Sequence, residues 1–242
     1  MQKIHVLLTK EELDHQRLEG RVVIVLDVLF ATTSALTALQ AGASAVIPAL
    51  GAEHARSIAA SLAPARAVLS GELDAETLPG FVHPTPLALL RQDLQDRILI
   101  YSTTNGTVAL HKAQQAAAQV YAASLRNAQV TIQHVLREHP HSTVLVVCAG
   151  SSAQFNLEDF YGAGLLVHGL QQAPGARSYS DAALAAALLT QGSDALRCLR
   201  ASRVGRLMTS RGLDAEVDYA AQLHTDSGVA RLQNGRLVRV PA

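Results

Sequence analysis

The sequence predicts an α/β fold in three layers, with a largely parallel central sheet and helices on both of its faces. Apolar runs of strand length alternate with segments of helical periodicity, which is the pattern of consecutive βαβ units. The runs VVIVLD, ILIY and TVLVVC are apolar on both sets of alternate positions, as expected for central strands that are buried on two faces.

The strand-like runs and the helical segments can be placed in chain order. We expect strands near 3–9, 21–27, 44–49, 66–70, 97–102, 119–123 and 143–148, with helices between them, as at 32–43, 52–63 and 125–138. Beyond about residue 171 the sequence indicates helices joined by short links. Near its end, Asn234-Gly235 separates two short apolar runs, which predicts a hairpin.

No low-complexity linker divides the chain, so we expect a single domain over residues 1–242. The change from alternating strands and helices to helices with short links leaves open a division into two subdomains, about 1–140 and 141–242, with the site between them. There is also a weak internal repeat. A shift of 74 positions overlays residues 22–46 on residues 96–120 without a gap, and Thr33 then falls on Thr107. Any two βαβ units share some of this patterning, so the similarity by itself does not establish a duplication.

Composition and charge exclude several classes of protein. Hydrophobic residues make up 49% and charged residues 17%, which is enough for a large core. Lys+Arg and Asp+Glu number 20 each, so we expect no nucleic-acid partner and no membrane partner. No apolar run approaches the roughly 20 residues that span a bilayer, and the start does not resemble a signal peptide. The two cysteines, Cys148 and Cys198, have no CxxC partner, which is typical of a reduced, cytoplasmic protein.

Three polar loops follow predicted strands, at 27–34, 101–107 and 148–159. In open α/β sheets, ligands bind beyond the carboxyl ends of the strands. Each loop leads into a predicted helix, whose first N–H groups and positive dipole end suit an anion. Small side chains and Gly106 allow the backbone to approach a ligand closely. The loops together therefore predict an oxyanion or phosphate site.

Each loop also has a purely structural interpretation. Ser, Thr and Asn are ordinary helix caps, although residues 102–107 supply more polar groups than one cap needs. Asp27 ends an apolar strand, so its carboxylate needs a metal, a salt bridge or a capping role. Glu72 opens the long connection 71–96 and is a candidate metal ligand, acid/base group or surface turn. For Glu158 and Asp159, the residues alone favour a role in the first turn of a helix.

Taken together, these segments resemble a known family. DVLFATTSALTAL, GE at 71–72, STTNGTVAL, LRNA at 125–128 and VCAG followed by LEDFYGAG occur in the order found in the 2-phosphosulfolactate phosphatase (ComB) family of coenzyme M biosynthesis. The resemblance runs from about residue 20 to about residue 170. It implies a ComB-like α/β/α fold and a Mg²⁺-dependent phosphatase that acts on (R)-2-phospho-3-sulfolactate or a related small phosphorylated acid.

The resemblance also implies roles for individual residues. It implies catalytic roles for Asp27 and Glu72, a phosphate site that includes Thr32, Thr33, Thr103, Thr104, Asn105, Gly106 and Thr107, and a magnesium site made from some of Asp27, Glu72, Glu158 and Asp159. The attacking group is either Asp27 or a metal-activated water. A homodimer is compatible with the sequence, which does not itself reveal the oligomeric state.

The chain departs from the family pattern at two places. Phe30 occupies the position of an arginine, and His83-Pro84-Thr85-Pro86 occupies that of a GNSP segment. Arginine is the natural bidentate partner of phosphate or sulfonate, and Arg126, Arg203, Arg206 and Arg211 are candidates to replace it. An alternative function is a non-catalytic protein that binds an anionic metabolite in the same pocket.

Overall fold

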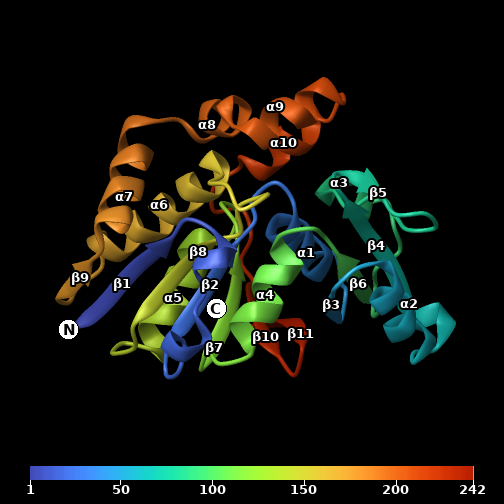
Figure 1. The fold of residues 1–242 in the computed structure, drawn as a ribbon, viewed down its shortest axis with the longest axis horizontal. Coiled ribbons are helices and arrows are strands. Elements are labelled where there is room, and N and C mark those ends of the chain that lie inside the picture. The colour runs from blue at the N-terminus through green and yellow to red at the C-terminus, as the bar shows by residue number, and fades with distance from the viewer. Residues whose placement is uncertain (242) are drawn as a thin grey trace.

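The computed structural model describes residues 1–241 of the chain (Figure 1). The strands are β1 (Gln2–Leu7), β2 (Val22–Leu26), β3 (Ala45–Ala49), β4 (Ala67–Leu73), β5 (Glu76–Thr77), β6 (Ile98–Ser102), β7 (Gln119–Ala123), β8 (Val144–Cys148), β9 (Arg177–Tyr179), β10 (Val229–Gln233) and β11 (Arg236–Val240). The helices are α1 (Ala31–Gln40), α2 (Ala52–Ala60), α3 (Pro86–Leu89), α4 (Gly106–Gln114), α5 (Ala128–Glu138), α6 (Leu157–Gln172), α7 (Asp181–Gly192), α8 (Ala195–Ala201), α9 (Arg203–Ser210) and α10 (Asp214–Ala220). Short 3₁₀ turns occur at Lys10–Glu12, His15–Arg17 and Pro64–Arg66.

The strands of residues 1–241 form one sheet of 11 strands in the order β5-β4-β6-β3-β11-β10-β7-β2-β8-β1-β9. It contains a large parallel block (β7, β2, β8, β1, β9) and a small parallel block (β3, β6, β4). The hairpin β10–β11 joins the blocks and runs antiparallel to its neighbour on each side. The predicted α/β fold, with its largely parallel sheet covered by helices, is confirmed.

The join between the two blocks rests on few ladder pairs. β10 meets β7 at two residue pairs, and β11 meets β3 at one. Two-stranded ribbons twist more strongly than wide sheets, and sparse pairing restrains the twist least. The antiparallel hairpin sets the two blocks in opposite directions, yet the residues that follow β2 and β6 come together, since Gly106 lies against Asp27. We attribute that geometry to the strong twist at the hairpin.

Helices α1 and α4 pack against strands of both blocks. Ala35 and Leu36 of α1 share one buried cluster with Leu110 of α4, and Val25 of β2 and Leu99 of β6 belong to the same cluster. Each helix is also a crossover between the blocks, because α1 leads from β2 to β3 and α4 leads from β6 to β7. The loops at the starts of α1 and α4 are therefore held between two apolar layers.

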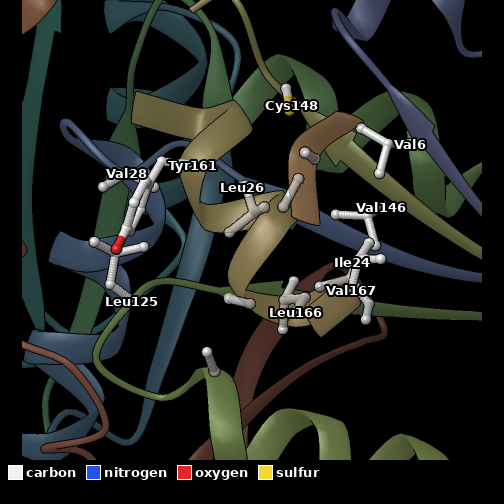
Figure 2. Close-up of a cluster of buried hydrophobic side chains, with 14 of the residues drawn as sticks. Val6, Ile24, Leu26, Val28, Leu125, Val146, Cys148, Tyr161, Leu166 and Val167 are labelled. Atoms are coloured by element: carbon white, nitrogen blue, oxygen red, sulfur yellow. The ribbon is translucent and has the colours of Figure 1, made fainter. Parts of the chain in front are cut away.

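Helix α6 lies close against the opposite face of the large block. Leu166 and Val167 of α6 pack among Leu26, Val146 and other strand side chains, as Figure 2 shows. At Gly162 a Cβ atom would lie 3.2 Å from the Val28 side chain, so the helix approaches the end of β2 closely. This contact fixes where the first turn of α6 meets the loop after β2. On the outer face of the small block, Ala55 of α2 covers a third apolar cluster.

The seven strands predicted between residues 3 and 148 and the closing hairpin are all present. The structure adds β5, β9 and the single-turn helix α3, which are too short to show a hydrophobic periodicity in the sequence. Helices α2, α5 and α7 to α10 occupy the predicted helical segments. None of the helices in the described part of the chain is long and apolar enough to cross a bilayer. The division near residue 140 stays a prediction.

A buried ion pair fastens the segment that leads to the hairpin. Arg126 donates to both carboxylate oxygens of Asp226, from Nη2 at 2.9 Å and from Nε at 3.2 Å, and its guanidinium lies 3.9 Å from the centre of the Tyr219 ring. Both charged side chains are less than 10% exposed. Arg126 is therefore a structural residue and does not replace the missing arginine at position 30.

We predict that Arg126→Met destabilises the protein by about 3–5 kcal/mol, because it leaves the Asp226 carboxylate buried without its partner. Chemical denaturation measures the effect. The double variant Arg126→Met/Asp226→Leu should recover most of the loss, since it removes the unpaired charge. Arg137→Met breaks the exposed pair with Glu138 and should change the free energy of unfolding by about 1 kcal/mol or less. Equal effects of Arg126→Met and Arg137→Met would contradict the prediction.

Candidate active site

The three predicted polar loops meet in the structure. The N–H of Val28, after β2, donates at 2.8 Å to the Asp159 carboxylate at the start of α6. The N–H of Thr104, after β6, donates at 2.7 Å to Glu72 at the end of β4. Each bond joins strand ends within one block, and the close approach of Gly106 to Asp27 brings the ends of the two blocks together.

A cavity of about 220 Å³ opens where these loops meet, and we call it the inner pocket. Its lining comprises Asp27, Leu29, Phe30, Ala31, Glu72, Asp74, Ala75, Thr103, Thr104, Asn105, Ser151, Ser152, Asn156, Arg203, Val204 and Leu207. Of the sequence-predicted site residues, Asp27, Glu72, Thr103, Thr104 and Asn105 border it. The other predicted residues lie behind its wall.

Asp27 is buried at the bottom of this arrangement. Its Oδ1 accepts the N–H of Phe30 at 2.9 Å, and its main chain is locked by Thr32, whose hydroxyl donates to the Asp27 carbonyl at 2.9 Å. Burial raises the pKa of Asp27 from its ordinary 3.8 to about 6, and the Glu72 carboxylate adds to the increase. Backbone N–H groups, including that of Gly106, oppose the shift. The side chain is a desolvated carboxylate that a cation would stabilise.

Glu72 is held by the loop that follows β6. Its Oε1 accepts the N–H of Thr104, and its Oε2 accepts the Thr104 hydroxyl at 3.1 Å and the N–H of Ala75 at 2.7 Å. Asp74 and Ala75 have φ angles of 52° and 63°, in the left-handed region. Such a pair costs conformational energy and is maintained only where surrounding contacts impose it. Here the contact is the bond from Ala75 to the carboxylate, which fixes the orientation of Glu72.

Gly106 is required at the point of closest approach between the two crossover loops. An added Cβ would lie 2.6 Å from Asp27 Oδ2 and would also collide with the methyl group of Ala31. Both partners are parts of the packed wall, so neither can easily move away. The predicted glycine therefore allows the start of α4 to approach Asp27, and a larger residue would displace the carboxylate.

Three predicted threonines stabilise the loops and do not line the pocket. The hydroxyl of Thr33 donates to the Val28 carbonyl, and that of Thr107 donates to the Thr103 carbonyl, each at 2.8 Å. The hydroxyl of Thr32 donates in the same way to the Asp27 carbonyl. All three side chains are fully buried. They act on a bound ligand only through the loop backbone they hold.

Glu158 and Asp159 are each 1% exposed, in the first turn of α6. Asp159 accepts the N–H groups of Val28 and Gly150, so it ties together the loops after β2 and β8. Neither oxygen of Glu158 makes a hydrogen bond within residues 1–241. Burial raises the pKa of Glu158 to about 7, and burial together with the Glu158 charge raises that of Asp159 well above its ordinary value. Both residues lie in the first turn of α6, as the residues alone indicated, but both are buried there.

A lysine that the sequence reasoning missed contributes to the site. Lys10 is 6% exposed, and its Nζ donates to Asn105 Oδ1 at 2.9 Å and to the Ala149 carbonyl at 3.4 Å. Lysine has only donors, so the oxygen of the Asn105 amide must face Lys10 and its NH₂ group is left for the pocket. In the sequence, Lys10 is only a lysine shortly after the first predicted strand, and nothing there connects it to residue 105.

Arg203 is the candidate arginine that borders the inner pocket. Its Nη2 donates to the side chains of Ser151 and Asn156, and it has no carboxylate partner in the described part of the chain. Arg211 borders a neighbouring cavity, and Arg206 donates to the Ala201 carbonyl on the outside of α9. The structure thus brings one guanidinium, from a residue remote in sequence, to the pocket where Phe30 supplies none.

Within residues 1–241, no three His, Cys, Asp or Glu side chains form a ready-made metal site. Of the four predicted carboxylates, Asp27 and Glu72 face the pocket, whereas Glu158 and Asp159 do not line it. Asp74 and several hydroxyl and amide side chains also border the pocket, so it offers oxygen donors besides these two carboxylates.

We predict an unusual pH dependence of stability in a chelating buffer. Between pH 4.5 and about 7 the folded protein holds a proton on Glu158 that the unfolded chain has lost, so the free energy of unfolding falls as the pH rises. Glu158→Gln removes the buried charge. At pH 8 it should stabilise the protein by on the order of 3 kcal/mol, and at pH 4 the difference should nearly vanish. Urea denaturation measures both values. The exposed Glu19→Gln is the control, and a destabilised Glu158→Gln at pH 8 would refute the prediction.

Comparison with known proteins agrees with this geometry. Residues 7–235 match the family model described as 2-phosphosulpholactate phosphatase. Proteins named "probable 2-phosphosulfolactate phosphatase" are similar to the chain: one from Deinococcus radiodurans is 33% identical, over 88% of each chain. One from Carboxydothermus hydrogenoformans is 34% identical, over 98% of this chain and 96% of its own. One from Thermus thermophilus is 32% identical, over 88% of each chain. The chain belongs to the 2-phosphosulfolactate phosphatase family.

Proposed function

We propose that the protein is a Mg²⁺-dependent phosphatase that hydrolyses the phosphate ester of (R)-2-phospho-3-sulfolactate or of a related small phosphorylated acid. The observation that carries the proposal is that Asp27 and Glu72 border the same small pocket as Thr103, Thr104 and Asn105. Carboxylates for a cation and donors for an oxyanion are thus combined in one place. Family membership and the names of the relatives support the same reaction.

The Asp27 and Glu72 carboxylates fit magnesium. Mg²⁺ usually keeps several waters and is bound by one or two protein carboxylates together with substrate phosphate oxygens. Asp27 and Glu72 would hold it, and the increase in the Asp27 pKa caused by burial and by Glu72 is the cost that a cation would remove. When bound, the ion neutralises phosphate charge and orients the group for attack. Asp159 holds the loops after β2 and β8 together behind the pocket.

Several donors of the chain are placed to bind the phosphate. The NH₂ group of Asn105 is oriented by Lys10 and faces the pocket. The hydroxyl of Thr103 accepts the N–H of Thr107 and keeps its own hydrogen for a ligand. The Arg203 guanidinium borders the same space. Fixed donors of this kind stabilise the charge that develops on a transferring phosphoryl group.

We predict that the purified protein releases phosphate from phosphorylated 2-hydroxy acids when Mg²⁺ is present and not in a chelator. Asp27→Asn and Glu72→Gln should each lower kcat/KM by roughly 10²–10⁴-fold, because each removes a charge at the reacting group. The exposed Glu53→Gln should retain full activity. If no ester is hydrolysed and ligands only raise the melting temperature, the phosphatase proposal fails and the binding-protein alternative is correct.

The attacking group is either the Asp27 carboxylate or a water, and the two leave different traces. Attack by Asp27 forms an aspartyl phosphate that a single turnover followed by an acid quench can capture on the protein. Attack by water transfers solvent oxygen-18 directly to phosphate and leaves no labelled protein. We expect one of these outcomes with the wild type. Asp27→Glu, which keeps the charge, provides the matched control for position.

A further inference from the structure

A second cavity continues from the inner pocket. It measures about 470 Å³, and we call it the outer pocket. The two cavities share Phe30, Glu72, Ala75, Val204 and Leu207 in their linings, so they adjoin each other. For a molecule whose phosphate lies in the inner pocket, the outer pocket is the neighbouring space.

The outer pocket is mainly apolar. Besides Phe30, Val204 and Leu207, its walls include Met208 and Leu213. These side chains come from the start of α1, from α9 and from the link to α10, three segments that the fold brings to one end of the molecule (Figure 1). Apolar walls of this extent favour an apolar occupant, because its burial removes hydrocarbon surface from water.

The charges in the outer pocket do not suit a second anion. Its guanidinium, from Arg211, is paired with Glu76 at 3.0 Å and also donates to the Ala75 carbonyl. Glu72 and Glu76 both border the space. A sulfonate placed there would face two carboxylates and a guanidinium that is already engaged. The Arg203 guanidinium, whose hydrogen bonds go to Ser151 and Asn156, borders the inner pocket and does not line the outer one.

Phe30 marks the boundary between the two environments. Its main-chain N–H donates to Asp27 Oδ1 at 2.9 Å, while its half-buried ring lines both cavities. In a phosphorylated 2-hydroxy acid, the group on C3 is separated from the phosphate by only a few bonds. With the phosphate beside Asp27, the C3 group would lie at the ring of Phe30 and at the entrance of the outer pocket.

We propose that the outer pocket is the subsite for the side group of the substrate, and that it takes an uncharged aromatic or branched aliphatic group. The substrate class is then the phosphate esters of 2-hydroxy acids with an apolar group on C3. This inference rests on the proposed phosphatase function and narrows it. Water supplies the oxygen and the protons, the ester P–O bond breaks, and the products are inorganic phosphate and the free 2-hydroxy acid.

A matched series of three substrates tests the proposal. The phosphate esters of lactate, 3-sulfolactate and 3-phenyllactate, with the same configuration at C2, differ only in the group on C3. With Mg²⁺ we expect kcat/KM for the phenyl ester to exceed that for the sulfonate ester by about tenfold or more, since small apolar differences in a pocket produce ratios of that size. Equal values, or a preference for the sulfonate ester, would overturn the proposal.

Two variants test whether the preference for the phenyl ester arises in the outer pocket. Phe30→Arg keeps the main-chain N–H that binds Asp27 and adds a cation, so it should reduce or reverse the preference for the phenyl ester. Leu207→Ser should weaken that preference. Leu188→Ser, at an exposed leucine of α7, should leave the ratio unchanged. A phenyl preference that survives both Phe30→Arg and Leu207→Ser would show that the side group binds elsewhere.

A binding measurement separates failure of this inference from failure of the phosphatase function. If none of the three esters is hydrolysed, the proposed function is wrong, and the subsite can still be tested with the free hydroxy acids. 3-Phenyllactate should then raise the melting temperature of the wild type more than 3-sulfolactate does, and Phe30→Arg should abolish the difference. An equal or opposite order would contradict the subsite directly.

Discussion

Four carboxylates, those of Asp27, Glu72, Glu158 and Asp159, are withdrawn from water at the junction of the three polar loops, and each residue is less than 10% exposed. Burial disfavours the charged form of a carboxyl group, and neighbouring carboxylates add to the effect, so the pKa of Asp27 and of both residues of α6 is raised. N–H groups of three loops bind Asp27, Glu72 and Asp159. Neither oxygen of Glu158 has a hydrogen-bond partner within residues 1–241. A fold that keeps this cluster needs rigid layers around it.

The crossovers supply the rigid layers. Because α1 passes from the large block to the small one and α4 passes back, the loops that precede them face each other across Gly106 and Asp27. The weak repeat in the sequence corresponds to these two units. A shift of 74 residues places β3 on β7 and superimposes most of α1 on α4. Thr33 and Thr107 also correspond in chemistry, since each hydroxyl donates to a carbonyl of its own loop.

The sequence was sufficient to predict local structure and the edge of the sheet that carries the site. Fully apolar strands such as Val22–Leu26 and polar turns that follow them leave a strong local signal. The link between the blocks could not be predicted in this way, because β10 and β11 are assigned to β7 and β3 by only three residue pairs between segments remote in the chain. Lys10 was missed, and Arg203 could not be singled out among the four candidate arginines, for the same reason: their partners, Asn105 and Ser151, lie 95 and 52 positions away.

The sequence also could not predict which loop side chains border the pocket and which bind only the backbone behind it. Thr32 and Thr103 are both threonines in polar loops that follow strands. The hydroxyl of Thr32 donates to the backbone, whereas Thr103 borders the pocket. The same distinction explains how position 30 can combine two tasks. Its N–H belongs to the backbone that orients Asp27, and any residue except proline supplies that donor. Its side chain points into the space beyond and is free to vary with the ligand. The orientation of Asp27 and the choice of the substrate's side group thus depend on different atoms of the same residue. A change from a cation to an aromatic ring at position 30 can therefore alter the preferred side group while Asp27 stays in place.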